Sequence, residues 1–165
     1  MKKVVSVFIL IGVMMFSTPC SASLFDDLRN NPNYIYYGGA GTGISFFLDK
    51  TSINVNKYEP PVYIIAFINM SYSAGFPKGG TPESVSPKTV WYKYNYDSRK
   101  MYLGRQNVDG ILSWEYIDTK NANKNSALNS IISGGEIAFY LAYNINFYKD
   151  GPLSWYAKSY FESLK

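Results

Sequence analysis

The chain has 165 residues, of which 47% are hydrophobic, and this is enough for one domain with its own core. It contains no histidine and one cysteine, Cys20. The chain after Cys20 therefore cannot form a Ser-His-Asp or Cys-His catalytic group. It also cannot form a zinc site with His or Cys ligands. The formal net charge of +4 is mild, and no cluster of Lys and Arg indicates a nucleic-acid partner.

Residues 1–22 have the pattern of a cleaved secretory signal peptide. Two lysines at the start precede an apolar run over 4–16, and small polar residues lead up to Ala22. The apolar run is shorter than the roughly 20 residues that a membrane span needs. We therefore expect cleavage after Ala22 or Ser23 and export to the periplasm, the cell surface or the medium.

Cleavage would leave a single globular domain of residues 24–165, with 14 basic and 12 acidic residues and no cysteine. Such a domain would depend on its core alone, without disulfides. A lipid-modified Cys20 is the alternative for the N-terminus. Pro19 argues against it, because lipidation sites normally have Gly, Ala or Ser directly before the cysteine.

Strand signals dominate the first half of this domain, after a helical turn predicted at 24–31. The aromatic-rich runs 33–39 and 44–50 flank a glycine-containing turn, the pattern of a β-hairpin. Residues 62–73 predict a long central strand, because apolar side chains occur on both of its faces.

Residues 74–87 contain three prolines and three glycines, so they predict a surface loop. Three strands follow, at 88–96, 101–106 and 111–118, and the short turns between them require antiparallel pairing. The polar stretch 119–129 is interpreted as another loop.

The hydrophobic period then becomes helical. Ser133 and Glu136 have the spacing of a capping box directly before an apolar run, which predicts a helix over 136–148. Pro152 at a first helical position predicts a second helix over 153–164.

Together these elements predict an α+β fold. It consists of an antiparallel sheet of about six strands, at about 33–118, with one or two C-terminal helices from about 134–165 packed on it.

The glycine-rich segment 38–45 resembles a phosphate-binding loop but has Ile44 where that loop needs lysine. A phosphate-binding loop also leads directly into a helix, whereas β-branched and aromatic residues follow here. A hairpin turn is therefore the better interpretation.

No pair of carboxylates has a catalytic pattern. Glu115 and Asp118, for example, are three residues apart on a predicted strand and point to opposite faces. We predict no catalytic residues, no metal site and no cofactor, so that the protein is not an enzyme. A carboxylate pair assembled in three dimensions and a haem held by tyrosinate stay open as alternatives.

Aromatic side chains on the three strands of 88–118 are the main indication of function. Trp91 and Trp114 are out of phase with some tyrosines of their strands, so rings lie on both faces and some are exposed. Exposed rings favour recognition of a protein or a glycan. The predicted interaction surface consists of Trp91, Tyr94, Tyr102, Trp114 and Tyr116.

Over 33–118, an aromatic strand, a glycine turn and a later aromatic meander occur in order. Their marker residues are Phe47, Asp49, Ser52, Ile53, Trp91, Tyr96, Arg99 and Trp114. This arrangement resembles the small exported bacterial domains of the surface-adhesin protein E family. The resemblance implies an antiparallel sheet with a packed helix, a location at the cell surface or in the periplasm, and binding of host extracellular proteins; haem binding is also described in that family.

We therefore expect an exported, non-catalytic binding or interaction protein of the bacterial envelope, adhesin-like, whose partner is a host or envelope protein or a glycan. The loop 74–87 would add to its aromatic surface. A small secreted hydrolase that uses a carboxylate pair and a purely structural envelope protein are the alternatives.

Overall fold

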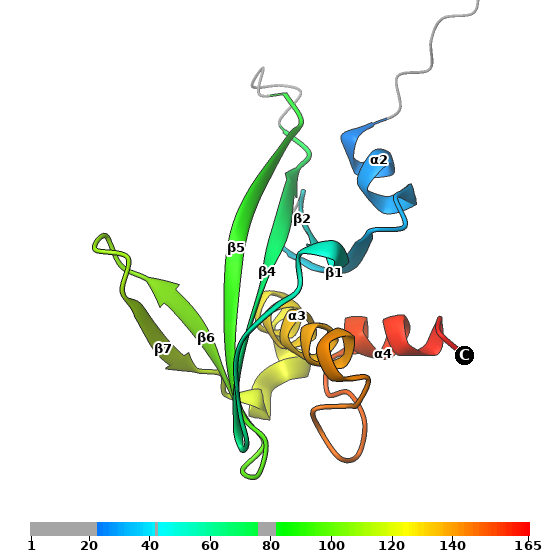
Figure 1. Cartoon of the computed structure of the whole chain (residues 1–165). Helices are drawn as coiled ribbons and strands as arrows, with labels where there is room; N and C mark the ends of the chain where they lie inside the picture. Colours follow the sequence, from blue (N-terminus) through cyan, green and yellow to red (C-terminus); the bar gives the residue numbers. More distant parts are fainter. Residues whose placement is uncertain (1–22, 42, 76–81) are drawn as a thin grey trace, which may run out of the picture.

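A computed structural model describes residues 23–41, 43–75 and 82–165. The predicted signal peptide, Cys20 and residues 76–81 of the predicted surface loop lie outside the described residues. The described chain forms a seven-stranded antiparallel sheet with helices packed on it, as predicted for the α+β class (Figure 1).

The sheet has the strand order β1-β2-β4-β5-β6-β7, and β3 pairs with β4 outside this path. The strands are β1 (Tyr34–Ala40), β2 (Ile44–Asp49), β3 (Asn54–Glu59), β4 (Val62–Ser73), β5 (Ser84–Asn95), β6 (Lys100–Gln106) and β7 (Leu112–Tyr116). On one side of β4, its first half pairs with β3 and its second half with β2. On the other side β5 pairs along its whole length. β4 is therefore central, as predicted.

Two strand predictions need correction. β3 was not predicted, because its sequence is polar and most of its residues are exposed. β5 begins at Ser84, so the last residues of the predicted loop are strand. Pro87 is tolerated there because β6 pairs with β5 only from Trp91 onward, which leaves this part of β5 with a neighbour on one side only.

The helices are α2 (Leu24–Asn30), α3 (Ser126–Tyr143) and α4 (Trp155–Glu162). The predicted start of the main helix is wrong, because Asn125 is its N-cap and accepts hydrogen bonds from the backbone N–H groups of Ala127 and Leu128. Ser133 and Glu136 lie inside α3 and are buried, so they form no capping box. The stretch 119–129 contains a 3₁₀ helix (Thr119–Lys124) and the first turn of α3 rather than a loop.

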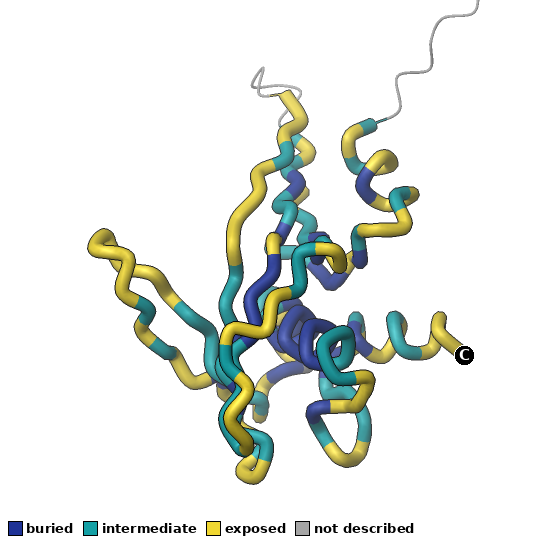
Figure 2. The backbone as a smooth tube through the Cα atoms, in the orientation of Figure 1, coloured by how far each residue is buried: buried dark blue, intermediate teal, exposed yellow. Residues whose placement is uncertain are grey.

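The core lies between α3 and one face of the sheet, where Figure 2 shows buried residues concentrated in α3 and the strands beside it. Phe139 of α3 is 1% exposed, and its ring centroid lies 5.0 Å from that of Tyr94. Gly134 and Gly135 allow this close approach, because a Cβ at Gly135 would lie 2.9 Å from the Tyr92 ring. The tertiary packing therefore favours a helix despite two glycines in its middle.

The glycine-rich segment is a hairpin turn, as predicted, because β1 and β2 pair on either side of it. Gly38 has a second role, since it lies in a bulge of β1 where α3 approaches closely. A Cβ at Gly38 would lie 2.7 Å from Cβ of Ser130, and the N–H of Gly39 donates a hydrogen bond to Ser130 Oγ (2.9 Å).

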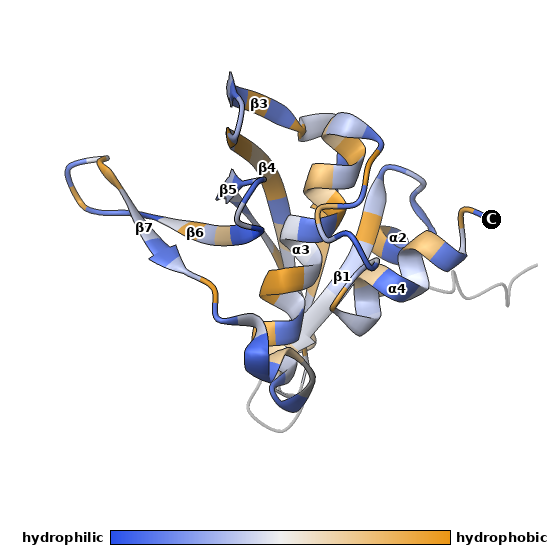
Figure 3. Ribbon diagram, turned by 90° about the horizontal axis from the view of Figure 1, so that it is seen from below, coloured by the Kyte–Doolittle hydropathy of each residue, from blue (hydrophilic) through white to orange (hydrophobic). Residues whose placement is uncertain are grey.

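The opposite face of the sheet is covered only in part. Around β1, β2 and β4, α2 packs Phe25 against Phe47 and Tyr72 in a second small cluster. The β6–β7 hairpin projects away from α2 and α4, as Figure 3 shows. None of the helices in the described ranges has the length and apolar character that crossing a membrane requires.

Candidate functional site

Four of the five residues predicted to form an interaction surface lie together on the face of the sheet opposite α3. Cross-strand partners point to the same face. Tyr102 of β6 pairs with Lys93 and with Tyr116, and Gly104 pairs with Trp91 and with Trp114. We call this group the aromatic platform, and its members are Trp91, Lys93, Tyr102, Trp114 and Tyr116.

The fifth predicted residue, Tyr94, is not on this surface. Its side chain is 0% exposed, and its hydroxyl donates a hydrogen bond to the carbonyl of Gly135 in α3 (2.8 Å). Burial raises the pKa of Tyr94 well above its usual value, which is typical of a core tyrosine. The prediction was wrong because Tyr94 alternates with Trp91 and Lys93 along β5 and faces the helix.

Lys93 lies at the centre of the aromatic platform. Its Nζ is 4.7 Å from the ring centroid of Tyr102 and 5.1 Å from that of Trp114, which are cation–π distances. The rings of Tyr102 and Tyr116 meet edge to face at 5.6 Å. Tyr116 is 50% exposed, and the other members are half-buried.

Gly104 provides the space for this arrangement. A Cβ at Gly104 would lie 2.6 Å from Cβ of Trp91 and 3.1 Å from Cζ3 of Trp114. Neither Lys93 nor Gly104 was predicted as part of the surface, although both could have been assigned to it by counting alternate residues from Trp91 and through the pairing of the strands.

A second candidate site is a cavity of about 700 Å³ between the ends of the paired parts of β5 and β6 and the start of α3, and Trp91 of the platform is among its lining residues. It forms where β6 separates from β5. The two strands pair only as far as Trp91 and Gly104, while β5 extends back to Ser84 and β6 continues to Gln106 (Figure 1). Its lining comes from β1, β2, β4, β5, β6 and α3, and from the residue after β6.

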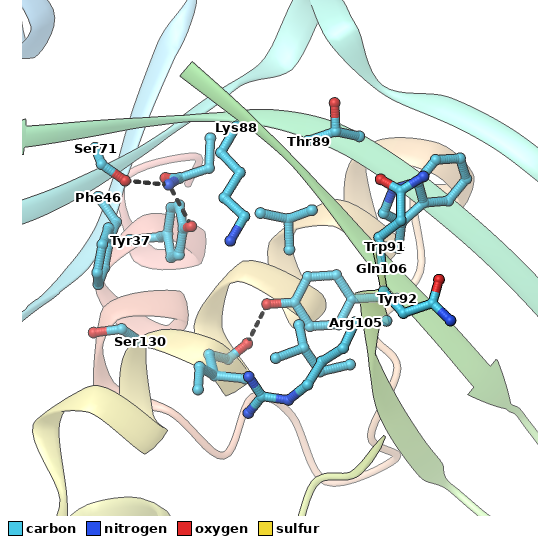
Figure 4. Close-up of a pocket in the computed structure, with 16 residues that line it drawn as sticks. Tyr37, Phe46, Ser71, Lys88, Thr89, Trp91, Tyr92, Arg105, Gln106 and Ser130 are labelled. Carbon is cyan, nitrogen blue, oxygen red and sulfur yellow. Dashed lines mark hydrogen bonds between the residues drawn. The ribbon is translucent and has the colours of Figure 1, made fainter. Parts of the chain in front are cut away.

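Hydrogen-bonded polar groups line one part of this cavity (Figure 4). The Tyr37 hydroxyl donates to Oδ1 of Asn69 (2.8 Å), and Nδ2 of Asn69 donates to Oγ of Ser71 (2.7 Å). The Tyr92 hydroxyl donates to the carbonyl of Ile131 (2.7 Å). Both hydroxyls are neutral donors near pH 7, as ordinary tyrosines are, and burial raises their pKa further.

Two cations, Lys88 and Arg105, also line the cavity. Figure 4 shows the Lys88 side chain extending between Tyr37 and Tyr92. Nε of Arg105 contacts the carboxylate of Glu115, which lies outside the lining. Among the residues that the structure describes, the lining includes no Asp or Glu, and its two charged side chains are both positive.

This composition determines which chemistry the cavity can support. A hydrolase with a carboxylate pair needs two acidic groups facing one cleft, and this cavity has none among its lining residues. Within the described ranges, no group of three or more acidic residues is placed to hold a metal ion. The cavity was not predicted, because it depends on where β6 leaves β5.

No protein-family model, no curated protein and no solved structure matches the chain. The functional inference therefore depends on the aromatic platform and the cavity themselves.

Proposed function

We propose that this is an exported, non-catalytic binding protein of the bacterial envelope, adhesin-like in character, and that its partner docks on the aromatic platform. The observation that carries this proposal is the grouping of two Trp and two Tyr side chains with Lys93 on a part of the sheet that no helix of the described residues covers. Trp and Tyr are the residue types most often found at the energetic centres of protein interfaces.

A protein partner is favoured over a glycan because of β7. Within the described residues β7 pairs only with β6, so this strand, which carries Trp114 and Tyr116, lies at the edge of the sheet. An extended segment of a partner can add to such an edge through main-chain hydrogen bonds, while its side chains reach the adjacent rings. The Lys93 ammonium also favours a segment that carries acidic residues.

Binding to immobilised laminin and fibronectin, with purified peptidoglycan as the glycan probe, tests the docking surface. Trp114→Ala and Tyr116→Ala should each weaken protein binding about 30-fold or more, as expected for central interface residues. Trp155→Ala is the matched control, because Trp155 is 46% exposed on α4 and lies outside the platform. Equal binding by all three variants, or binding to peptidoglycan alone, would contradict this assignment.

Export is tested separately. The full chain, expressed in a Gram-negative host, should appear in the periplasm or medium with a new N-terminus at Ser23 or Leu24. An unprocessed chain that stays in the cytoplasm would show that the exported location is wrong, whatever the platform binds.

A further inference from the structure

We propose that the cavity between β5, β6 and α3 binds a small amphipathic anion, with a carboxylate or phosphate head at Lys88 and Arg105 and an apolar body against the walls. This second site lies where β5 and β6 separate and shares Trp91 with the aromatic platform, but the two cations that define it, Lys88 and Arg105, are outside the platform, so it does not depend on the function proposed there.

The size and walls of the cavity fit a small molecule. Its volume of about 700 Å³ lies in the range of small-molecule sites, roughly 300–1,000 Å³. Apolar walls come from several elements and surround the polar groups described above. They consist of Phe46, Val90, Leu103 and Ile131.

The hydrogen-bonding groups select the charge of the ligand. The hydroxyl protons of Tyr37 and Tyr92 are already donated to Asn69 and to the carbonyl of Ile131. The remaining charged donors are Lys88, which makes no salt bridge within the described residues, and the terminal nitrogens of Arg105. These exposed groups can pair with an acceptor-rich ligand, which a carboxylate or phosphate provides.

Arg105 is already positioned for this role. Its Nε contacts Glu115 in an exposed ion pair, and its side chain lines the cavity. Lys88 approaches from β5, and Figure 4 shows the Lys88 and Arg105 side chains on either side of the Tyr92 hydroxyl. A bound anion would therefore bridge the two strands where their pairing ends.

The experiment uses 8-anilinonaphthalene-1-sulfonate, a fluorescent aromatic anion, as the probe on the mature domain. We expect saturable binding that dodecanoate and dodecyl phosphate displace. Dodecyl maltoside, which has the same chain but no charge, and inorganic phosphate, which has no apolar body, should displace it at least 10-fold less effectively. Equal displacement by the neutral compound would overturn the proposal.

The double variant Lys88→Gln, Arg105→Gln should weaken dodecanoate binding at least 10-fold, because two charge-assisted contacts are lost. Lys100→Gln is the matched control, since Lys100 is an exposed cation on the same strand as Arg105 but outside the cavity. Leu103→Trp should block the cavity while keeping both cations. Thermal melts show whether each variant is folded.

Unchanged binding in the folded double variant and in the folded Leu103→Trp protein would refute the site. Phosphatidylglycerol vesicles distinguish a free ligand from a lipid surface. Sedimentation with these vesicles without any binding of free dodecanoate would overturn the small-molecule site and indicate a membrane headgroup instead.

Discussion

The two faces of β5 and β6 carry similar residues in different environments. On the face toward α3, Tyr92 and Tyr94 are 1% and 0% exposed, and their hydroxyls donate to helix carbonyls. On the other face, Trp91 and Tyr102 are half-buried, with Lys93 beside Tyr102. Successive residues of one strand therefore belong to a core and to a surface.

The difference shows that ring content alone does not define a binding surface. A strand places alternate residues on opposite faces, and whichever face the helix covers becomes the core. The covered rings stabilise the fold, whereas the uncovered rings contact mainly each other and Lys93, which leaves them able to contact a partner. Substitutions on the two faces should therefore have different effects on stability.

The largest effect should come from truncating a ring on the covered face. Phe139→Ala removes a side chain that is 1% exposed and contacts the rings of Tyr94 and Phe147. It should lower the free energy of unfolding by about 3–5 kcal/mol. Tyr116→Ala on the platform should cost less than about 1 kcal/mol in the same urea titration. Similar costs for both would break the distinction between the faces.

The covered side also holds a buried carboxylate, which should make stability depend on pH. Glu136 is 2% exposed and accepts hydrogen bonds from the N–H groups of Leu153 (2.6 Å) and Ser154 (3.1 Å), and from the Ser154 hydroxyl. Burial raises its pKa from 4.5 to about 7, although these hydrogen bonds and nearby Lys158 partly oppose the shift. Glu136 therefore joins α3 to the start of α4.

Because the folded-state pKa is the higher one, the folded protein binds a proton more tightly than the unfolded chain. The contribution of Glu136 to stability is fully present below pH 4.5 and is lost as the pH rises through about 7. The total loss is about 3 kcal/mol, from 1.36 kcal/mol per pKa unit. Urea unfolding between pH 4.5 and 8 should show this slope, and Glu136→Gln should remove it. The control Glu162→Gln, an exposed change on α4, should keep the pH slope of the stability. A slope that persists in the Glu136→Gln protein would exclude Glu136 as its source.

A smaller effect should come from the contact between β1 and α3. Gly38→Ala would place a Cβ 2.7 Å from Cβ of Ser130, at a φ of +134°. Its cost should be about 1–3 kcal/mol from overpacking. Gly41→Ala is the control, because Gly41 also has a positive φ (+61°) but nothing lies within 4 Å of its Cβ position. Gly41→Ala should lower the free energy of unfolding by about 1 kcal/mol from backbone strain alone. Equal melting temperatures of the Gly38→Ala and Gly41→Ala proteins would show that the close approach to α3 is unimportant.

The fold class and most strands could be predicted from local patterns, since residues 62–73 and the glycine hairpin have clear periodicity and turn chemistry. The start of α3 could not be predicted. Ser133 and Glu136 have the spacing of a capping box, but Ser133 bonds to the Asn129 carbonyl within α3 and Glu136 bonds to Ser154 at the start of α4. β3 was missed because its polar residues pair with β4 without burying a hydrophobic face.

The site shows the same limit. Alternation predicted four residues of the aromatic platform, but it did not indicate which face α3 would cover, and so Tyr94 was misplaced. The cavity depends on the point where β6 leaves β5, and this involves contacts between residues far apart in the chain, such as Tyr37, Lys88 and Ile131. No local pattern contains that information.

The smallest effect should come from the cation of the platform. Lys93→Met keeps an apolar side chain but removes the charge from above the rings of Tyr102 and Trp114. The free energy of unfolding should fall by about 0.5–1 kcal/mol, the size of a partly exposed cation–π contact. Lys100→Met, an exposed change on the neighbouring strand, should leave it unchanged.

Side-chain NMR makes the same variant a sharper test. Resonances of Tyr102 and Trp114 should move in Lys93→Met, whereas those of Tyr92 and Tyr94 should stay in place, because the strand backbone separates the two environments. If the buried tyrosines move as much as the platform rings, the two faces of β5 are coupled. Partner binding at the platform would then affect the core, and the rings could not be treated as an independent docking surface.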